Sequence, residues 1–183
     1  MSDFFSVKGV FSPKHITAMA MLLGIRTILN LPFLTIYLGP NFKLITFAYV
    51  TDAICVMLFG PIAGLVFGFA GDALGFLATS GLAGGYFPGF ALSEMVTCLI
   101  FAIFFYKQNI TIPRVIIAWF INLFVVLLGL NMVWLILMYG MDAGSIYTGA
   151  RFITNLAQAP IHIIILFLLL PRVMKLAERS RIL

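Results

Sequence analysis

The chain contains 183 residues, of which 63% are hydrophobic and only 9% are charged, and its formal net charge is +5. A typical soluble domain is about 45–50% apolar and about 25% charged, and a chain this short cannot bury so much apolar surface in one core. The composition excludes a soluble enzyme, a nucleic-acid-binding module and a disordered regulator. It predicts an integral membrane protein whose main solvent is the lipid bilayer.

Six apolar stretches are each long enough to cross a bilayer, which takes about 20 residues of helix. Turn-forming or polar residues interrupt them at Gly39-Pro40-Asn41, at Gly60-Pro61 and over 81–89, 107–113 and 140–145. We therefore predict an all-α integral membrane bundle of six transmembrane helices that forms a single membrane domain over residues 1–183. The predicted spans are roughly 15–38, 42–60, 61–80, 87–106, 113–139 and 148–172.

The positions of the basic residues indicate how the bundle is oriented. Lys and Arg side chains concentrate near both ends of the chain and in the break at 107–113: Lys8, Lys14, Lys107, Arg114, Arg172, Lys175, Arg179 and Arg181. Short segments rich in Lys and Arg stay on the cytoplasmic side of a membrane. We therefore expect both termini to be cytoplasmic.

Neither nucleotide hydrolysis nor metal binding is indicated by any motif. The glycine-rich run 81–85 is not followed by the Lys-Ser/Thr pair of a phosphate-binding loop, and Cys55 and Cys98 both lie within apolar runs. We expect no enzymatic activity and no cofactor. If the protein takes part in ATP-driven transport, the ATPase belongs to another subunit.

The sixth predicted span carries a polar stripe. Arg151, Asn155, Gln158 and His162 follow one another at i, i+4, i+7 and i+11 and therefore share one helix face. The stripe ends there, because residues 163–170 are wholly apolar. A channel would need the polar face to continue, whereas polar side chains over half of a span are typical of a cavity. The stripe predicts a pocket that opens to the outside.

Further polar and aromatic residues lie at similar depths in the other predicted spans. These candidate site residues are Arg26, Tyr49, Asp72, Tyr86, Phe87, Pro88, Glu94, Asn131 and Trp134. Aromatic rings together with a few convergent polar groups suit a planar, polar small molecule. Structural interpretations stay open for four of the candidate residues: a buried ion pair between Arg26 and Asp72, a core position for His162 in the polar stripe, and a place in the interfacial aromatic belt for Trp134.

Small residues indicate where helices meet closely. Gly64, Gly68, Gly71 and Gly75 form one stripe on the third predicted span, which is typical of close helix packing. On the first span, Thr17, Ala20, Gly24 and Thr27 form a small-residue face, and Arg26 points roughly 140° away from its centre. That face meets either a neighbouring helix or a separate membrane subunit.

Several segments resemble the substrate-binding S components of energy-coupling factor (ECF) vitamin transporters. Phe59 to Gly64 and Gly71 to Gly75 are similar to segments shared by several S components. Ser12 to Arg26 and the segment Tyr86-Phe87-Pro88-Gly89-Phe90 resemble the folate-specific members in particular. The contact motif of the first helix is usually Ala-xxx-Ala in this family, and here it is Ala20-xxx-Gly24.

The resemblance implies high-affinity capture of folate or a related pterin from outside a bacterial cell. Thr17, Ala20 and Gly24 would contact a scaffold membrane subunit, which works with two ATPase subunits. A carboxylate or an Asn would read the amide edge of the pterin, whose flat face would stack on Trp134 or Tyr49. Arg151 and Lys43 are placed to meet the two carboxylates of the glutamate tail. The alternatives are an S component for another vitamin, such as pantothenate or riboflavin, and a channel-like or structural membrane protein.

Overall fold

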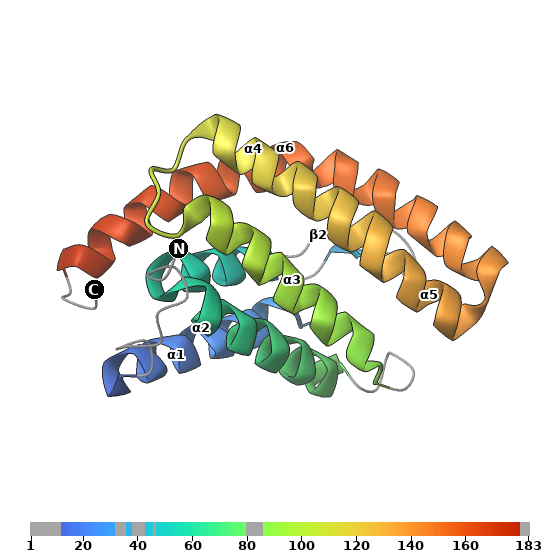
Figure 1. Ribbon diagram of the computed structural model, residues 1–183, viewed down its shortest axis with the longest axis horizontal. Coiled ribbons are helices and arrows are strands. Elements are labelled where there is room, and N and C mark those ends of the chain that lie inside the picture. The colour runs from blue at the N-terminus through green and yellow to red at the C-terminus, as the bar shows by residue number, and fades with distance from the viewer. Residues whose placement is uncertain (1–11, 32–35, 38–42, 46, 80–85, 180–183) are drawn as a thin grey trace.

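The structure is a computed structural model that describes residues 12–31, 36–37, 43–45, 47–79 and 86–179. Helices account for almost all of these residues (Figure 1): α1 (Pro13–Leu29), α2 (Ala48–Thr79), α3 (Pro88–Phe105), α4 (Ile112–Asn122), the π-helix η1 (Leu123–Leu130), α5 (Asn131–Tyr139) and α6 (Met141–Arg179). Two short strands, β1 (Ile36–Tyr37) and β2 (Lys43–Ile45), pair antiparallel.

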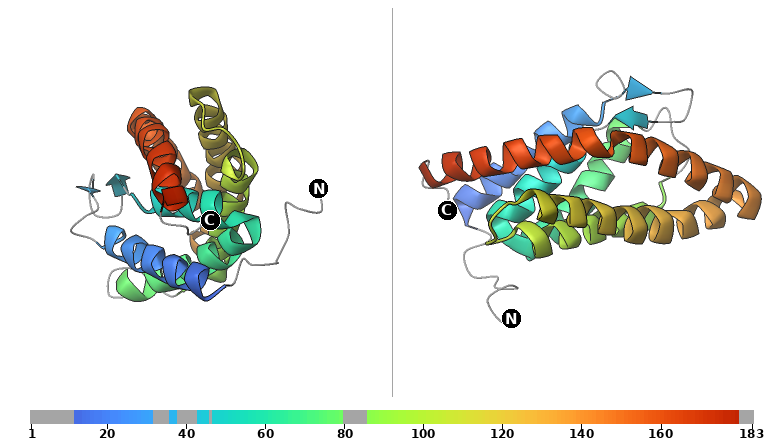
Figure 2. Two further views of the ribbon diagram at one scale, coloured as in Figure 1. Left: turned by 90° about the vertical axis from the view of Figure 1, so that its left-hand side faces the viewer. Right: turned by 90° about the horizontal axis from the view of Figure 1, so that it is seen from above.

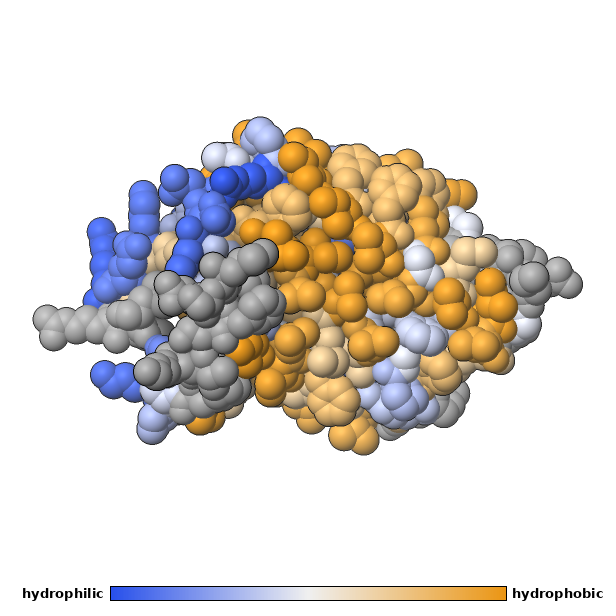
Figure 3. Space-filling model, in the orientation of Figure 1, coloured by the Kyte–Doolittle hydropathy of each residue, from blue (hydrophilic) through white to orange (hydrophobic). Residues whose placement is uncertain are grey.

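The helices form an elongated bundle with an apolar belt. α4, η1 and α5 follow one another along one side and are antiparallel to α6, whereas α1, α2 and α3 form the other side (Figures 1 and 2). Hydrophilic side chains gather at the end where α1 begins and α6 ends, and apolar side chains cover the middle (Figure 3). Within the described residues, four helical stretches are long and apolar enough to cross a membrane: Ala48–Ala78, Pro88–Phe105, Ile112–Met138 and Phe152–Arg179.

The long helix α2 breaks and doubles back at Gly60. This residue has φ 87° and ψ −176°, a conformation that favours glycine, and Pro61 follows it. In a straight helix, residues eight apart are about 12 Å apart along the axis. Here a Cβ atom on Gly64 would collide with the side chain of Val56, so the chain turns back between them. The helix therefore breaks at the position where the sequence predicted the second span to end.

The beginning of the chain differs from the prediction. We expected the first span to continue to residue 38, but α1 ends at Leu29, and Ile36–Tyr37 belong to a strand. Leu31 precedes Pro32, and a residue before proline disfavours the helical conformation. The second span was expected from residue 42, but α2 begins at Ala48 because Lys43–Ile45 pair with β1 instead.

The later helices agree more closely with the predicted spans. α3 matches the span 87–106, and α4, η1 and α5 together match 113–139. α6 is longer than expected, since it begins at Met141 directly after the break at Gly140 and continues to Arg179. The glycine-rich run 81–85 lies outside the described residues.

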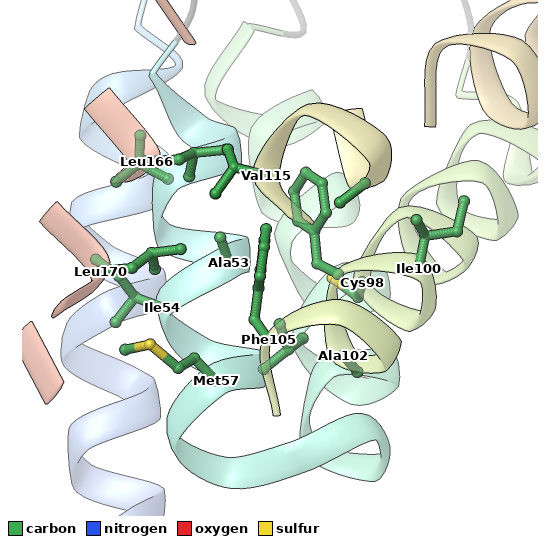
Figure 4. Packing of buried hydrophobic residues seen from close by; sticks show 14 of the residues in the cluster. Ala53, Ile54, Met57, Cys98, Ile100, Ala102, Phe105, Val115, Leu166 and Leu170 are labelled. Carbon is green, nitrogen blue, oxygen red and sulfur yellow. The ribbon is translucent and has the colours of Figure 1, made fainter. Parts of the chain in front are cut away.

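The apolar core lies where α2, α3, α4 and α6 meet (Figure 4). Leu166 and Leu170 of α6 are fully buried against α2, and Phe105 of α3 and Val115 of α4 complete the cluster. Helices in lipid associate through close van der Waals packing rather than through a hydrophobic driving force. The fit of these side chains therefore holds the two sides of the bundle together.

The glycine stripe of α2 faces the protein interior, as predicted. A Cβ atom on Gly68 would lie 2.9 Å from the backbone carbonyl oxygen of Glu94 in α3, and one on Gly75 would lie 3.4 Å from the side chain of Asn30 after α1. The stripe lets the second half of α2 approach both neighbouring helices closely.

We predict that Gly68→Ala lowers the stability of the protein by about 1–3 kcal/mol, because the backbone of α3 cannot move away as a side chain would. Unfolding by denaturant in detergent micelles measures the effect. Gly24→Ala is the matched control, since a Cβ atom at Gly24 would meet no atom of another described element within 4 Å. Equal stability of the two variants would contradict the close packing of α2 against α3.

Candidate ligand-binding site

Three charged side chains meet in the apolar interior and form what we call the ion cluster: Arg26, Asp52 and Glu94. The Nε atom of Arg26 donates to Asp52 Oδ1 at 2.7 Å, and its Nη2 atom donates to Glu94 Oε2 at 2.9 Å. Arg26 and Asp52 are only 3% and 1% exposed. A charge in this environment is stable only when it is paired and hydrogen-bonded. The cluster therefore joins α1, α2 and α3.

The second half of α2 completes the walls around Arg26. A Cβ atom on Gly71 would lie 2.5 Å from Arg26 Nη1, so glycine at this position makes room for the guanidinium group. The side chain of Glu94 remains 37% exposed, unlike those of its two partners. The cluster has one positive and two negative groups, so the partly exposed Glu94 carboxylate is available to accept hydrogen bonds from a ligand.

The ion cluster replaces the ion pair considered from the sequence, which joined Arg26 to Asp72. Among the described residues, the salt-bridge partners of Arg26 are Asp52 and Glu94. Asp72 instead forms a side-chain hydrogen bond with Tyr86, whose ring packs against Phe76 with the ring centroids 5.1 Å apart. Asp72 therefore contacts the segment that leads into α3 and does not pair with Arg26 on α1.

Aromatic side chains surround the beginning of α3. The ring of Phe87 lies 5.8 Å from that of Trp134 on α5 and 6.0 Å from that of Phe90, measured between centroids. Trp134 Nε1 donates to Ser93 Oγ at 3.0 Å, one residue before Glu94. Trp134 therefore packs against α3 instead of projecting freely into the interfacial belt. Pro88, which was also predicted for the site, is the first residue of α3.

A second polar group lies around His162 of α6. The imidazole packs against the ring of Tyr49 with centroids 4.1 Å apart, and Trp119 Nε1 donates to its Nδ1 atom at 3.4 Å. Within this group, His162 Nε2 and the Tyr49 hydroxyl are buried without a hydrogen-bond partner among the described residues; Asn131 Oδ1, on α5, is another such atom. Tyr49 and Asp52 are three residues apart on α2, so this group adjoins the ion cluster. Most buried polar atoms in proteins have a hydrogen-bond partner, so these atoms are candidates for contact with a ligand.

The polar stripe of α6 faces the protein interior where its side chains are described. Gln158 and His162 are 3% and 4% exposed, and Asn155 is half-buried. The side chains of Arg151 and Lys43, which we expected to meet ligand carboxylates, lie outside the described part of the structure.

The small-residue face of α1 points away from the site. Thr17, Ala20 and Gly24 are all exposed and Thr27 is half-buried, whereas Arg26 on the same helix is buried. The angular separation expected from the sequence is therefore present in the folded chain. One helix has an inner polar face and an outer face of small side chains.

Reasoning from the sequence missed two residues that shape the site. Asp52 lies in an apolar run, and the rule that intramembrane charges are paired, which singled out Arg26, would also have identified it. Trp119 gave no such signal, because a tryptophan in a span is ordinarily interpreted as packing or as part of the interfacial belt. Its contact with His162 depends on how α4 packs against α6.

The apolar helices of this protein enclose a site with charged and aromatic side chains. This combination is typical of membrane proteins that bind a small polar ligand. The sequence profile of the family described as ECF transporter, substrate-specific component, matches residues 14–170, and the chain belongs to this family. The family description agrees with a binding rather than a catalytic function.

Three known proteins show how similar the chain is to other members. It is 32% identical to the folate transporter FolT of Clostridium novyi over 123 residues, and this aligned region covers 67% of this chain and 70% of that protein. It is 30% identical over 163 residues to FolT of Leuconostoc mesenteroides, which covers 86% and 87%. A crystal structure of FolT bound with folic acid is 29% identical, with a TM-score of 0.74, and covers 86% of this chain and 91% of that one.

We predict that Asp52→Asn lowers the stability by about 3 kcal/mol, because it removes the fully buried negative partner of a buried guanidinium group. Glu94→Gln is the comparison variant, and it should lower the stability by about 1 kcal/mol or less because this side chain is partly exposed. Denaturant unfolding of both variants in the same detergent measures the difference. A larger loss for Glu94→Gln would show that Asp52 does not anchor the cluster.

Proposed function

We propose that the protein captures folate, or a closely related pterin, from outside a bacterial cell and delivers it for ATP-driven uptake by an ECF transporter. The observation that carries this proposal is the similarity to FolT proteins over most of the chain, including a FolT structure with bound folic acid. The partners would be a scaffold membrane subunit and two ATPase subunits.

The chemistry of the site supports a pterin ligand. The amide edge of a pterin has N–H groups, and the partly exposed Glu94 carboxylate is an acceptor for them. The flat ring system of a pterin can stack on the aromatic rings of Phe87 and Trp134, which lie near Glu94 at the beginning of α3. The atoms without partners on Tyr49 and His162 provide further hydrogen-bonding positions. Arg151 and Lys43 remain our candidates for the two carboxylates of the glutamate tail.

The course of the backbone supports a single membrane domain with six spans. The reversal at Gly60 divides α2 into two antiparallel halves, which, together with α1, α3, the run α4–α5 and α6, make six segments. α1 has 17 residues, the lower end of the range of about 17–25 residues that crosses a bilayer. Basic side chains at the end where α1 begins and α6 ends favour a cytoplasmic position for that end, and hence for both termini.

The exposed small face of α1 supports contact with the scaffold subunit. Thr17, Ala20 and Gly24 present little side-chain volume toward the surroundings, and a Cβ built on Gly24 meets no described atom within 4 Å apart from the nearby backbone of α1 itself. Small residues at this spacing let a second helix approach closely in a membrane. Binding of the vitamin and assembly with the transporter would thus use opposite sides of one helix.

We predict that the purified protein alone binds folate with a stoichiometry near one, which isothermal titration calorimetry measures. Trp134→Ala should raise the Kd by roughly fivefold or more, because stacking on an aromatic ring contributes on the order of 1 kcal/mol. Trp134→Phe, which keeps a ring but loses the donor to Ser93, should lie between the wild type and Trp134→Ala. Saturable heat from another vitamin and none from folate would reject the ligand while retaining the class.

A second prediction separates binding from transport. Arg151→Ala and Asn155→Leu should weaken folate binding, the former by at least about tenfold because it removes charge-assisted hydrogen bonds. Ala20→Trp and Gly24→Val should leave the Kd nearly unchanged but reduce uptake of labelled folate by cells that contain the complete transporter. If the α1 variants lost binding and uptake together, the small face would be internal packing and not a partner contact.

A further inference from the structure

Trp119 of α4 is packed directly beside His162 of α6. Its indole is only 5% exposed and belongs to one apolar cluster with Ala159 and Ile163, which lie in the same stretch of α6 as His162. From this position, Trp119 Nε1 donates to His162 Nδ1 at 3.4 Å. The packing of α4 against α6 therefore holds a hydrogen-bond donor against one edge of the imidazole.

This hydrogen bond determines which nitrogen of His162 carries the proton. The indole N–H group of tryptophan only donates, so the imidazole nitrogen that faces it must have a free lone pair. A doubly protonated imidazole has no free lone pair, and in a neutral one the proton then lies on the other nitrogen. His162 Nε2 is therefore an N–H donor.

The Nε2–H group has no acceptor among the described residues, although it is buried. Tyr49 covers one face of the imidazole, and the bonds of Nδ1 and Nε2 diverge, so Nε2 points away from Trp119. Asp52 of the ion cluster follows Tyr49 on α2 after about one helical turn. A buried donor without an acceptor costs free energy, so a ligand that brings an acceptor to this position is favoured.

We propose that Trp119 is a positioning residue that holds His162 in this tautomer, so that His162 Nε2 donates to an acceptor atom of the bound ligand. The inference rests on the proposed function, since a pterin provides acceptors in its carbonyl oxygen and its ring nitrogens. With Glu94 as acceptor and His162 as donor, the site matches a flat ring system that has both kinds of group. A ligand with an N–H group beside Nε2 would bring two donors together, and Trp119 prevents a change of tautomer that would relieve this.

Nitrogen NMR of the purified protein in detergent, with isotopically labelled histidine, reports the tautomer directly. The chain has two histidines, and His15→Gln assigns their signals. We expect His162 to carry its proton on Nε2 with and without folate, and we expect folate to shift the Nε2 signal more than the Nδ1 signal. Trp119→Phe, which keeps an aromatic ring without a donor, should give a mixture of both tautomers.

Folate titration calorimetry of a double-mutant cycle tests how Trp119 acts. His162→Phe keeps a ring beside Tyr49 but loses one neutral hydrogen bond to the ligand, so it should raise the Kd roughly three- to tenfold. Trp119→Phe should raise it by a smaller factor. Adding Trp119→Phe to His162→Phe should raise it no further, because Trp119 acts through His162.

Trp134→Phe is the matched control for this cycle. It also removes an indole donor, but that donor is bonded to Ser93, so its effect on the Kd should add to that of His162→Phe. The melting temperature of each variant in the same detergent verifies that it is folded.

The proposal is overturned if His162 carries its proton on Nδ1, or if folate binds and leaves the Nε2 signal unchanged. It is also overturned if the effects of Trp119→Phe and His162→Phe on the Kd add, because Trp119 would then contribute packing alone. A wild-type protein that binds no folate would contradict the proposed function, whereas the tautomer of His162 without ligand would still test the role of Trp119.

Discussion

The fold depends on placing one guanidinium group in an environment that excludes water. Arg26 on α1 is almost completely buried, and it remains charged there because Asp52 and Glu94 approach it within hydrogen-bonding distance. Each of these contacts joins α1 to a different helix. In a bundle where lipid and interior are equally apolar, such directional contacts distinguish one helix arrangement from another. The ion cluster thus specifies the arrangement that apolar packing alone would leave open.

The glycine stripe on α2 is the steric condition for that cluster. Gly71 leaves the space that the guanidinium group occupies, and Gly68 lets α3 approach closely enough for Glu94 to reach Arg26. The turn at Gly60 brings both halves of α2 to the same place, so Asp52 and Gly71 meet one side chain from two directions. Small residues and charged residues therefore act together, and neither set would produce the site without the other.

The same constraint explains how the candidate binding site and the assembly surface that we propose fit on one short helix. Because Arg26 must face the interior, the opposite side of α1 is exposed, and it carries the small residues Ala20 and Gly24. A ligand that alters the ion cluster would therefore act directly on the helix that we propose for contact with the scaffold. This link requires no long pathway through the protein, since both sites belong to one rigid element.

The sequence by itself determined the membrane class, the breaks at Gly60 and Gly140 and the inward face of α6, because composition and helical periodicity are local properties. It indicated the family through the resemblance of short segments such as Tyr86 to Phe90. It did not determine where α1 ends, because the apolar residues that follow Leu29 suit a span or a strand equally well, and their pairing as β1 and β2 was decided elsewhere in the chain. Nor did it determine the partner of Arg26. Periodicity places a side chain on a helix face, but only the packing of α1 against α2 and α3 decides that Asp52, and not Asp72, neutralises it.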